Sequence, residues 1–209
     1  MRSFVRLMGV RDGMSILDLG GAPTIWNSVN LRLNLTILNL PGSLSCDITG
    51  VPTHHNICYV EGDACDVDRF GDRSFDLVFS NSVIEHVGPS DKQASFAREA
   101  RRLGQSYWVQ TPSSWFPIEA HCGMPLWWFY PDELRHYFIE RWYKTLSGNP
   151  WVQYIEETTV LSRSDLMHLF PESTVLVETV LGIPKSNIAY FRGPSDESIK
   201  RDWGPTSAH

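Results

Sequence analysis

The sequence lacks the features of a membrane or exported protein. No apolar run in its 209 residues reaches the roughly 20 residues that a helix needs to cross a bilayer. The first residues, Met1–Gly13, contain no hydrophobic segment followed by a small-residue cleavage site, as a signal peptide would. These absences predict a cytoplasmic protein with no membrane partner.

Cysteine is scarce and irregularly spaced. The four cysteines, Cys46, Cys58, Cys65 and Cys122, form no CxxC pair, which disfavours a zinc knuckle or a disulfide framework and predicts reduced thiols. Basic residues are also few, since 18 Lys and Arg stand against 24 Asp and Glu and give a formal net charge of -6. Nucleic-acid affinity depends mainly on Lys and Arg that neutralise phosphates, so the composition disfavours a nucleic-acid partner.

Short apolar runs alternate with longer amphipathic stretches along the chain. This alternation is typical of βα units that form a parallel sheet. We predict five strands in these runs, each ended by Gly, Pro, Asn or Asp or by a polar neighbour: Met14–Leu19, Leu35–Asn39, Ile57–Val60, Phe75–Ser80 and Ser106–Gln110.

Other segments complete the predicted domain. Ser90–Leu103 carries apolar residues at helical spacing between a serine and Gly104, so we expect a crossover helix there, and a short helix over Arg163–Phe170. Two late strands, Thr174–Val180 and Asn187–Arg192, are expected to form a hairpin on the sheet edge. The prediction is one α/β domain over residues 1–209, with a doubly wound, mostly parallel seven-stranded sheet.

The segment Thr111–Glu157 is rich in tryptophan and proline. It contains five of the eight tryptophans and five prolines. Ligands of open α/β sheets bind at the carboxyl ends of the strands, so an aromatic insert after the fifth strand is expected to form a lid or substrate wall. An extra packing layer or a homodimer interface is an equal alternative.

A glycine pair follows the first predicted strand. The run DLGGAPT starts at Asp18, so an acidic residue at the strand end precedes Gly20 and Gly21 at a sharp turn. Without side chains at the glycines, main-chain N–H groups can approach a ligand, and the next helix offers further donors. A tight turn that binds nothing is the alternative. A dinucleotide site is disfavoured, because GxGxxG is absent.

Three landmarks follow one another along the chain. Ile16–Gly21 combines an apolar strand, an acid and a glycine turn; Asp63 comes just after the third strand; and Phe75–His86 runs from the fourth strand into polar residues. In these features, over about Ser15–Gln110, the sequence resembles the class I S-adenosylmethionine-dependent methyltransferases. The resemblance implies their Rossmann-like fold, with S-adenosylmethionine as the cofactor. It implies these cofactor-binding residues: Asp18, Gly20, Gly21, Ala22, Pro23, Asn39, Asp63, Ala64, Asn81 and Ser82.

Two features depart from the family's usual pattern. Ala22 and Thr24 stand in the glycine loop where glycine is commonest, which predicts a tighter loop. Asn39 ends the second strand where the family usually has Asp or Glu for the ribose hydroxyls. Its amide can accept one hydrogen bond and donate another, and its alternative role is a turn residue before Pro41 and Gly42. These departures leave open a non-catalytic binding protein of the same fold.

Two acid–histidine pairs are candidates for the chemistry. Methyl transfer is an in-line displacement from a sulfonium, so an enzyme aligns the acceptor and, for a hydroxyl, removes a proton. Glu85 and His86 follow the fourth strand, whereas Glu119 and His121 lie in the insert. We expect these four residues to converge, with His121 or His86 as the base, because histidine titrates near neutral pH. Alternatively, His86 packs on the cofactor, and Glu119 and His121 form a loop hydrogen-bond pair.

The same four side chains could bind a divalent cation. Two carboxylates and two imidazoles suit Mg²⁺ or Mn²⁺, which would orient the acceptor's oxygens and lower a hydroxyl's pKa. Some methyltransferases with a similar Glu-His after the fourth strand use a metal in this way. A metal site at Glu85, His86, Glu119 and His121 is therefore an open hypothesis.

The insert also bears on the acceptor. Thr111–His121, with Leu161–Leu166 and Leu169–Pro171, resembles a bacterial methyltransferase group of polysaccharide and secondary-metabolite pathways, including sugar O-methyltransferases of mycobacterial polymethylated polysaccharide synthesis. Tryptophans offer flat surfaces that stack on sugar rings. The resemblance implies O-methylation of a carbohydrate, a sugar or short oligosaccharide. Phenolic O-methylation is the alternative. A nucleic-acid methyltransferase is disfavoured, because no Asn/Asp-Pro-Pro-aromatic motif follows the fourth strand.

Overall fold

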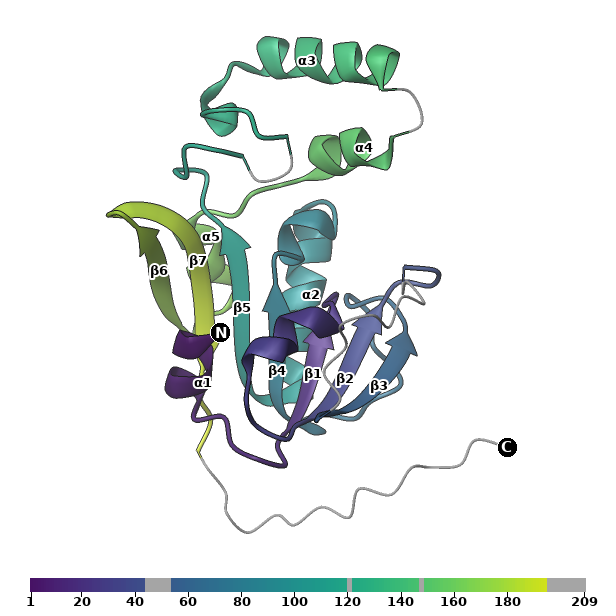
Figure 1. Ribbon diagram of the computed structural model, residues 1–209, viewed down its shortest axis with the longest axis vertical. Coiled ribbons are helices and arrows are strands. Elements are labelled where there is room, and N and C mark those ends of the chain that lie inside the picture. Colours follow the sequence, from purple (N-terminus) through teal and green to yellow (C-terminus); the bar gives the residue numbers. More distant parts are fainter. Residues whose placement is uncertain (44–53, 120–121, 147–148, 195–209) are drawn as a thin grey trace.

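The computed structural model describes residues 1–43, 54–119, 122–146 and 149–194 (Figure 1). Its centre is a seven-stranded sheet in the order β3-β2-β1-β4-β5-β7-β6. The strands are β1 (Ser15–Leu19), β2 (Asn34–Asn39), β3 (Asn56–Glu61), β4 (Phe75–Asn81), β5 (Gly104–Pro112), β6 (Thr174–Val180) and β7 (Ile183–Phe191).

The sheet is mixed, so the expectation of a mostly parallel sheet is wrong. Strands β1 to β5 pair in parallel, but β7 is antiparallel to both of its neighbours, β5 and β6. The reason is the short connection between β6 and β7, which consists of Leu181 and Gly182. Both residues have positive φ, +52° and +79°, as a tight hairpin turn requires. A connection this short can only reverse the chain, so the predicted late hairpin is present.

Helices cover both faces of the sheet. On one face α2 (Ser90–Leu103) and α5 (Arg163–Leu169) pack an apolar stripe against the strands, with Phe96, Ala100 and Leu103 of α2 fully buried. On the other face lie α1 (Arg2–Met8) and the short 3-10 helix η1 (Pro23–Ser28). A doubly wound arrangement of this kind leaves the carboxyl ends of the parallel strands accessible to ligands.

Four aromatic rings hold α1 and η1 to the sheet. Phe4 of α1 lies edge-on to Trp26 of η1, Phe79 of β4 and Trp108 of β5, with ring centroids 4.8–5.9 Å apart. Edge-on contacts between aromatic rings add stability beyond the apolar area that they bury. The first residues of the chain are therefore part of the main core.

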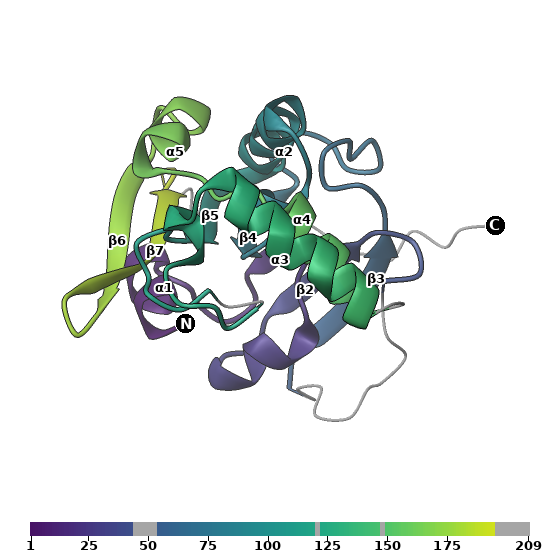
Figure 2. The ribbon, with the colours of Figure 1, turned by 90° about the horizontal axis from the view of Figure 1, so that it is seen from above.

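The chain between β5 and α5 folds into a small helical unit, here called the α3–α4 unit (residues 113–157). It contains η3 (Trp127–Phe129), α3 (Asp132–Thr145) and α4 (Pro150–Glu157). Trp127, Ile139, Val152 and Ile155 form an apolar cluster of its own. In Figure 1 the unit stands beyond the carboxyl ends of the parallel strands, and Figure 2 shows α3 crossing above them.

A helix that crosses a bilayer must be both long and apolar, at roughly 20 residues. In the described part of the chain, no helix combines the length and the apolar character that this requires.

Candidate functional site

A cavity of about 390 Å³ lies at the carboxyl ends of β1 to β4. Parallel strands bring the residues that follow them to one edge of the sheet, although these residues are far apart in sequence. Five of the predicted site residues line this cavity: Gly20, Asn39, Asp63, Ala64 and His86. Apolar walls come from Leu38, Val83 and Val87, so the cavity combines flat apolar surface with a few polar groups, as small-molecule sites do.

The glycine turn after β1 tolerates no side chain at either position. Gly20 has φ +73°, and a Cβ there would lie 2.7 Å from the side chain of Val83. A Cβ on Gly21 would lie only 1.9 Å from Oδ2 of Asp18. The first glycine therefore provides a left-handed backbone at the cavity wall, and the second leaves room for the Asp18 carboxyl group.

Hydrogen bonds fix this turn against the neighbouring strand. The N–H of Gly20 donates to the carbonyl of Leu38, and Nδ2 of Asn39 donates to the carbonyl of Gly21 at 2.9 Å. The N–H of Gly20 is therefore used within the sheet and does not reach a ligand, contrary to the expectation for this turn. Asn39 has two roles, because it lines the cavity and supports the turn.

Asp18 lies beneath the turn and outside the cavity lining. Its side chain is fully buried, and Oδ2 accepts the indole N–H of Trp26 at 2.8 Å. Within the described residues, Oδ1 has no hydrogen-bond partner. Burial raises the pKa of this carboxyl to about 7, while the bond from Trp26 acts in the opposite direction. Asp18 thus supports the glycine turn from inside the core.

Asp63 forms the opposite wall of the cavity. Its Oδ1 accepts the backbone N–H of Cys65 at 2.8 Å, and its Oδ2 lies 3.5 Å from Nζ of Lys92. The first contact closes a turn after β3, and the second places a positive charge beside the half-exposed carboxylate. Asp63 can still accept a hydrogen bond from a ligand, because a carboxylate has about four lone-pair sites.

Four further residues predicted to bind the cofactor lie outside this cavity. Ala22 and Pro23 form the start of η1. Ser82 has φ +56°, and its N–H donates to the carbonyl of Gln110. Asn81 lines a second cavity, on the face of the sheet that α1 covers.

His86 and Glu85 connect the end of β4 to the α3–α4 unit. Glu85 is fully buried in η2 (Ile84–His86), and its Oε2 accepts the hydroxyl of Thr111 at 3.0 Å. Nδ1 of His86 lies 3.0 Å from Oγ1 of Thr158, which itself donates to the carbonyl of Tyr154. The Thr158 hydroxyl therefore accepts from His86, so the ring carries a hydrogen on Nδ1.

The remaining contacts of His86 are also within the protein. Its Nε2 lies 3.8 Å from Oε1 of Glu85, and its ring stacks on Tyr154 with the centroids 3.8 Å apart. Both ring nitrogens thus face protein groups. Tyr154 is a cavity residue that the sequence analysis missed, because nothing in the pattern of α4 distinguishes it from a surface tyrosine.

Of the second acid–histidine pair, the structure describes Glu119 only. Glu119 is buried, and its Oε2 accepts the backbone N–H of Cys122 at 2.7 Å. His121 lies outside the described residues. Within the part of the chain that is described, no group of three or more His, Cys, Asp and Glu side chains could hold a metal ion. Glu85, His86 and Glu119 instead make contacts within the protein, so the described donors do not fit a metal centre.

The sequence also matches a known family in part. A family model described as "Methyltransferase domain" matches residues 42–106, which include the turn after β3 and the whole of β4. No curated protein matches the chain.

Solved structures show similarity over nearly the whole chain. Haemonchus contortus phosphoethanolamine N-methyltransferase 2, in complex with S-adenosyl-L-methionine, has a TM-score of 0.58 and 13% identity, over 93% of this chain and 52% of that one. A SAM-dependent methyltransferase from Aquifex aeolicus has a TM-score of 0.51 and 13% identity, over 90% and 87% of the two chains. The chain thus spans about half the length of the Haemonchus enzyme.

These findings agree with the geometry of the site. The sheet order, the antiparallel β7 and the cavity beside the glycine turn occur together with a methyltransferase domain match. Together they support S-adenosylmethionine as the cofactor. The chain has the Rossmann-like fold of the S-adenosylmethionine-dependent methyltransferases.

Proposed function

We propose that this protein is an S-adenosylmethionine-dependent O-methyltransferase that acts on a hydroxyl group of a small molecule. The 390 Å³ cavity carries the proposal, because residues predicted for the cofactor come from several strand ends to line it. Leu38, Val83 and Val87 offer the apolar surface that an adenine ring needs. Asn39 and Asp63 offer polar atoms for the ribose and the base.

The chemistry requires alignment and the removal of one proton. When bound, the cofactor supplies a methyl group on a sulfonium. His121 is the base that removes the hydroxyl proton, with Glu119 as its partner, because both ring nitrogens of His86 face protein groups. Glu85 and His86 then act as positioning residues that hold the α3–α4 unit against the end of β4.

A carbohydrate is the proposed acceptor, and residues 111–157 are the proposed substrate-binding segment of a single methyltransferase domain. Exposed aromatic rings of the α3–α4 unit support this choice. Trp115 is 66% exposed and lies edge-on to Phe129, which is 51% exposed, with the centroids 5.2 Å apart. Flat apolar rings of this kind stack on the apolar faces of sugars.

Calorimetric titration with S-adenosylhomocysteine tests the cofactor site. We expect micromolar binding by the wild type, at least tenfold weaker binding by Asp63→Ala, and no change in Asp66→Ala. Asp66 is the matched control, because it lies in the same turn but outside the cavity lining. Failure of the wild type to bind would favour a non-catalytic protein of this fold.

The acceptor is tested separately. Purified protein with radiolabelled S-adenosylmethionine is offered panels of glycosides, catechols and amines, and products are analysed by mass spectrometry. Methylated sugar hydroxyls would support the proposal. Product from the catechols alone would show a phenolic O-methyltransferase, and product from the amines alone would contradict O-methylation.

Metal removal gives a further prediction. The described carboxylates and His86 make contacts within the protein, so we expect turnover to be unchanged after dialysis against a chelator. Activity that is lost on chelation and restored by Mg²⁺ or Mn²⁺ would instead show that a cation takes part.

A further inference from the structure

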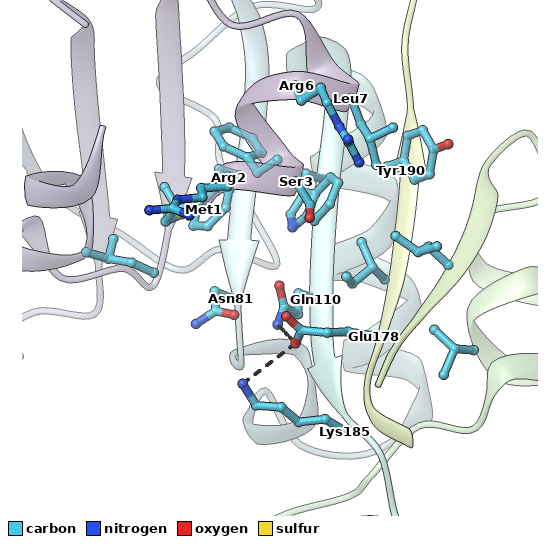
Figure 3. Close-up of a pocket in the computed structure, with 17 residues that line it drawn as sticks. Met1, Arg2, Ser3, Arg6, Leu7, Asn81, Gln110, Glu178, Lys185 and Tyr190 are labelled. Carbon is cyan, nitrogen blue, oxygen red and sulfur yellow. Dashed lines mark hydrogen bonds and ion pairs between the residues drawn. The ribbon is translucent and has the colours of Figure 1, made fainter. Parts of the chain in front are cut away.

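A second and larger cavity, of about 810 Å³, lies between α1 and the β6–β7 hairpin (Figure 3). Its described lining shares no residue with the 390 Å³ cavity. Buried apolar side chains of the main core form its floor: Phe4, Phe79, Trp108 and Ile188. Nothing in the sequence motifs accounts for this cavity.

Polar groups lie at two sides of this floor. Figure 3 shows Arg2 and Arg6 on α1, and, toward the carboxyl ends of the strands, Asn81, Gln110, Glu178 and Lys185. The lining thus has three cationic side chains, those of Arg2, Arg6 and Lys185, against one carboxylate, in a chain whose net charge is -6. This local excess of positive charge favours an anionic ligand.

The one carboxylate is already hydrogen-bonded within the protein. Oε2 of Glu178 accepts the hydroxyl of Ser186 at 2.8 Å and the amide N–H of Gln110 at 3.5 Å, and it lies 3.7 Å from Nζ of Lys185. Figure 3 shows the Gln110 and Lys185 side chains converging on this oxygen. Glu178 therefore holds the two side chains in place at the cavity end.

Other donors in the lining lack acceptors. Within the described residues, the side chains of Arg2, Arg6 and Asn81 have no hydrogen bond or ion pair, and the indole N–H of Trp108 is buried without a partner. A buried donor without an acceptor costs free energy, so the N–H of Trp108 is expected to have a partner in the functional state, whereas Arg2 and Arg6 are exposed to solvent. A ligand with several acceptor oxygens would meet this excess of donors.

The cavity also reaches the edge of the sheet where the cofactor cavity lies. Phe79 and Asn81 of β4 line the larger cavity, whereas Val83, two residues further along, lines the smaller one. Ile25, which follows the glycine turn, lines the larger cavity as well. The two cavities therefore lie on either side of the same short stretches of chain.

We infer that the 810 Å³ cavity is a second ligand site, separate from the proposed acceptor site at the α3–α4 unit, and that it binds a small acidic molecule with an apolar face and a carboxylate or phosphate group. The apolar face lies on the aromatic floor. The anionic group is bound at the side of the floor where Arg2 and Arg6 of α1 lie.

Two probes that differ in one carboxylate test the preference. These are 4-nitrophenyl β-D-glucuronide and 4-nitrophenyl β-D-glucoside, with 4-nitrophenyl phosphate as the phosphate arm. Binding is measured by calorimetry on the full chain saturated with S-adenosylhomocysteine. We expect the glucuronide or the phosphate to bind at least tenfold more tightly than the glucoside. Equal binding of all three probes, or binding of none, would overturn the inference.

Charge reversal locates the site. We expect Arg2→Glu combined with Arg6→Glu to remove the preference for the anionic probe and leave S-adenosylhomocysteine binding unchanged. Arg69→Glu combined with Arg163→Glu is the matched control, because it makes the same change in net charge from two exposed positions outside the cavity lining. An equal loss in the control would show a general charge effect and would contradict the assigned site.

The two proposals can fail separately. A wild type that binds the anionic probe but not S-adenosylhomocysteine, when each is titrated alone, would refute the proposed function and support the anion-binding cavity. A wild type that binds S-adenosylhomocysteine but shows no anion preference would support the cofactor site and refute the acidic ligand of the 810 Å³ cavity.

Discussion

Gly21 and the carboxyl group of Asp18 occupy a space with no room for a methyl group. In Gly21→Ala the new Cβ would lie 1.9 Å from Oδ2 of Asp18, so the carboxyl must move and lose its bond to Trp26. We expect a loss of about 1–3 kcal/mol in the free energy of unfolding, as overpacked cores show, together with weaker S-adenosylhomocysteine binding.

Urea denaturation measures this effect, with Gly71→Ala as the control. A methyl group at Gly71 would meet no atom within 4 Å, and the backbone there has no positive φ, so this substitution should cost little. Equal stability of the two variants would contradict the account of the turn.

Asp18 should make stability depend on pH. Its pKa is raised to about 7 in the folded protein, against about 3.9 in an unfolded chain. Between these values the folded protein holds a proton that the unfolded chain has released, so the free energy of unfolding falls as the pH rises from about 4 to 7. Above pH 7 the buried charge costs up to about 4 kcal/mol.

The variant Asp18→Asn removes this titration. We expect it to be more stable than the wild type at pH 8 and to show a flatter profile between pH 4 and 7, by denaturation at several pH values. Parallel profiles for the two proteins would show that Asp18 does not titrate in this range.

At the scale of elements, the strands and the helices α2 and α5 could be predicted well, whereas α1 and the helices of the α3–α4 unit could not. Buried strands are apolar runs between turn residues, so β1 to β5 lie where the sequence predicts them, and α2 has the predicted bounds Ser90–Leu103. The helix α1 was missed, because only Phe4 and Met8 mark its buried face. In α3 only Ile139 is buried, so its sequence carries little helical pattern.

The candidate site could be predicted only in part, for a reason that lies in strand geometry. Residues after neighbouring parallel strands meet at one edge, so Gly20, Asn39 and Asp63 could be grouped from the sequence. Successive side chains of a strand point to opposite faces, and sequence does not show which cavity each face borders. Asn81 was therefore assigned to the cofactor but lines the 810 Å³ cavity.

The contact between η2 and α4 gives an element-scale prediction. Thr158→Val removes the acceptor for the Nδ1 hydrogen of His86, which should cost about 1 kcal/mol and speed the hydrogen exchange of α4 amides. Thr145→Val is the control, because that hydroxyl bonds only within α3. Equal hydrogen exchange of the α4 amides in the two variants would contradict a stabilising role for the hydrogen bond between His86 and Thr158.

At the scale of the whole molecule, the α3–α4 unit and the sheet have separate apolar clusters. Trp127 is 2% exposed at the centre of the unit's cluster. We expect Trp127→Ala to cost about 3–5 kcal/mol of local stability, so that α3 and α4 lose hydrogen-exchange protection while β1 and β4 keep theirs.

Trp115→Ala controls for the loss of an indole ring, since Trp115 belongs to the same unit but is largely exposed. Protection that falls equally in the sheet and in the unit would show that the two unfold as one cooperative body.

The place of β7 between β5 and β6 has a consequence for biosynthesis. A ribosome synthesises β5 before β7. The edge of β5 that carries Tyr107, Trp108 and Val109 therefore has no partner strand while the intervening segment is translated. At roughly 5–20 residues per second this interval lasts several seconds. An open strand edge can pair with other chains, so the nascent protein passes through a period in which chaperone protection would improve its yield.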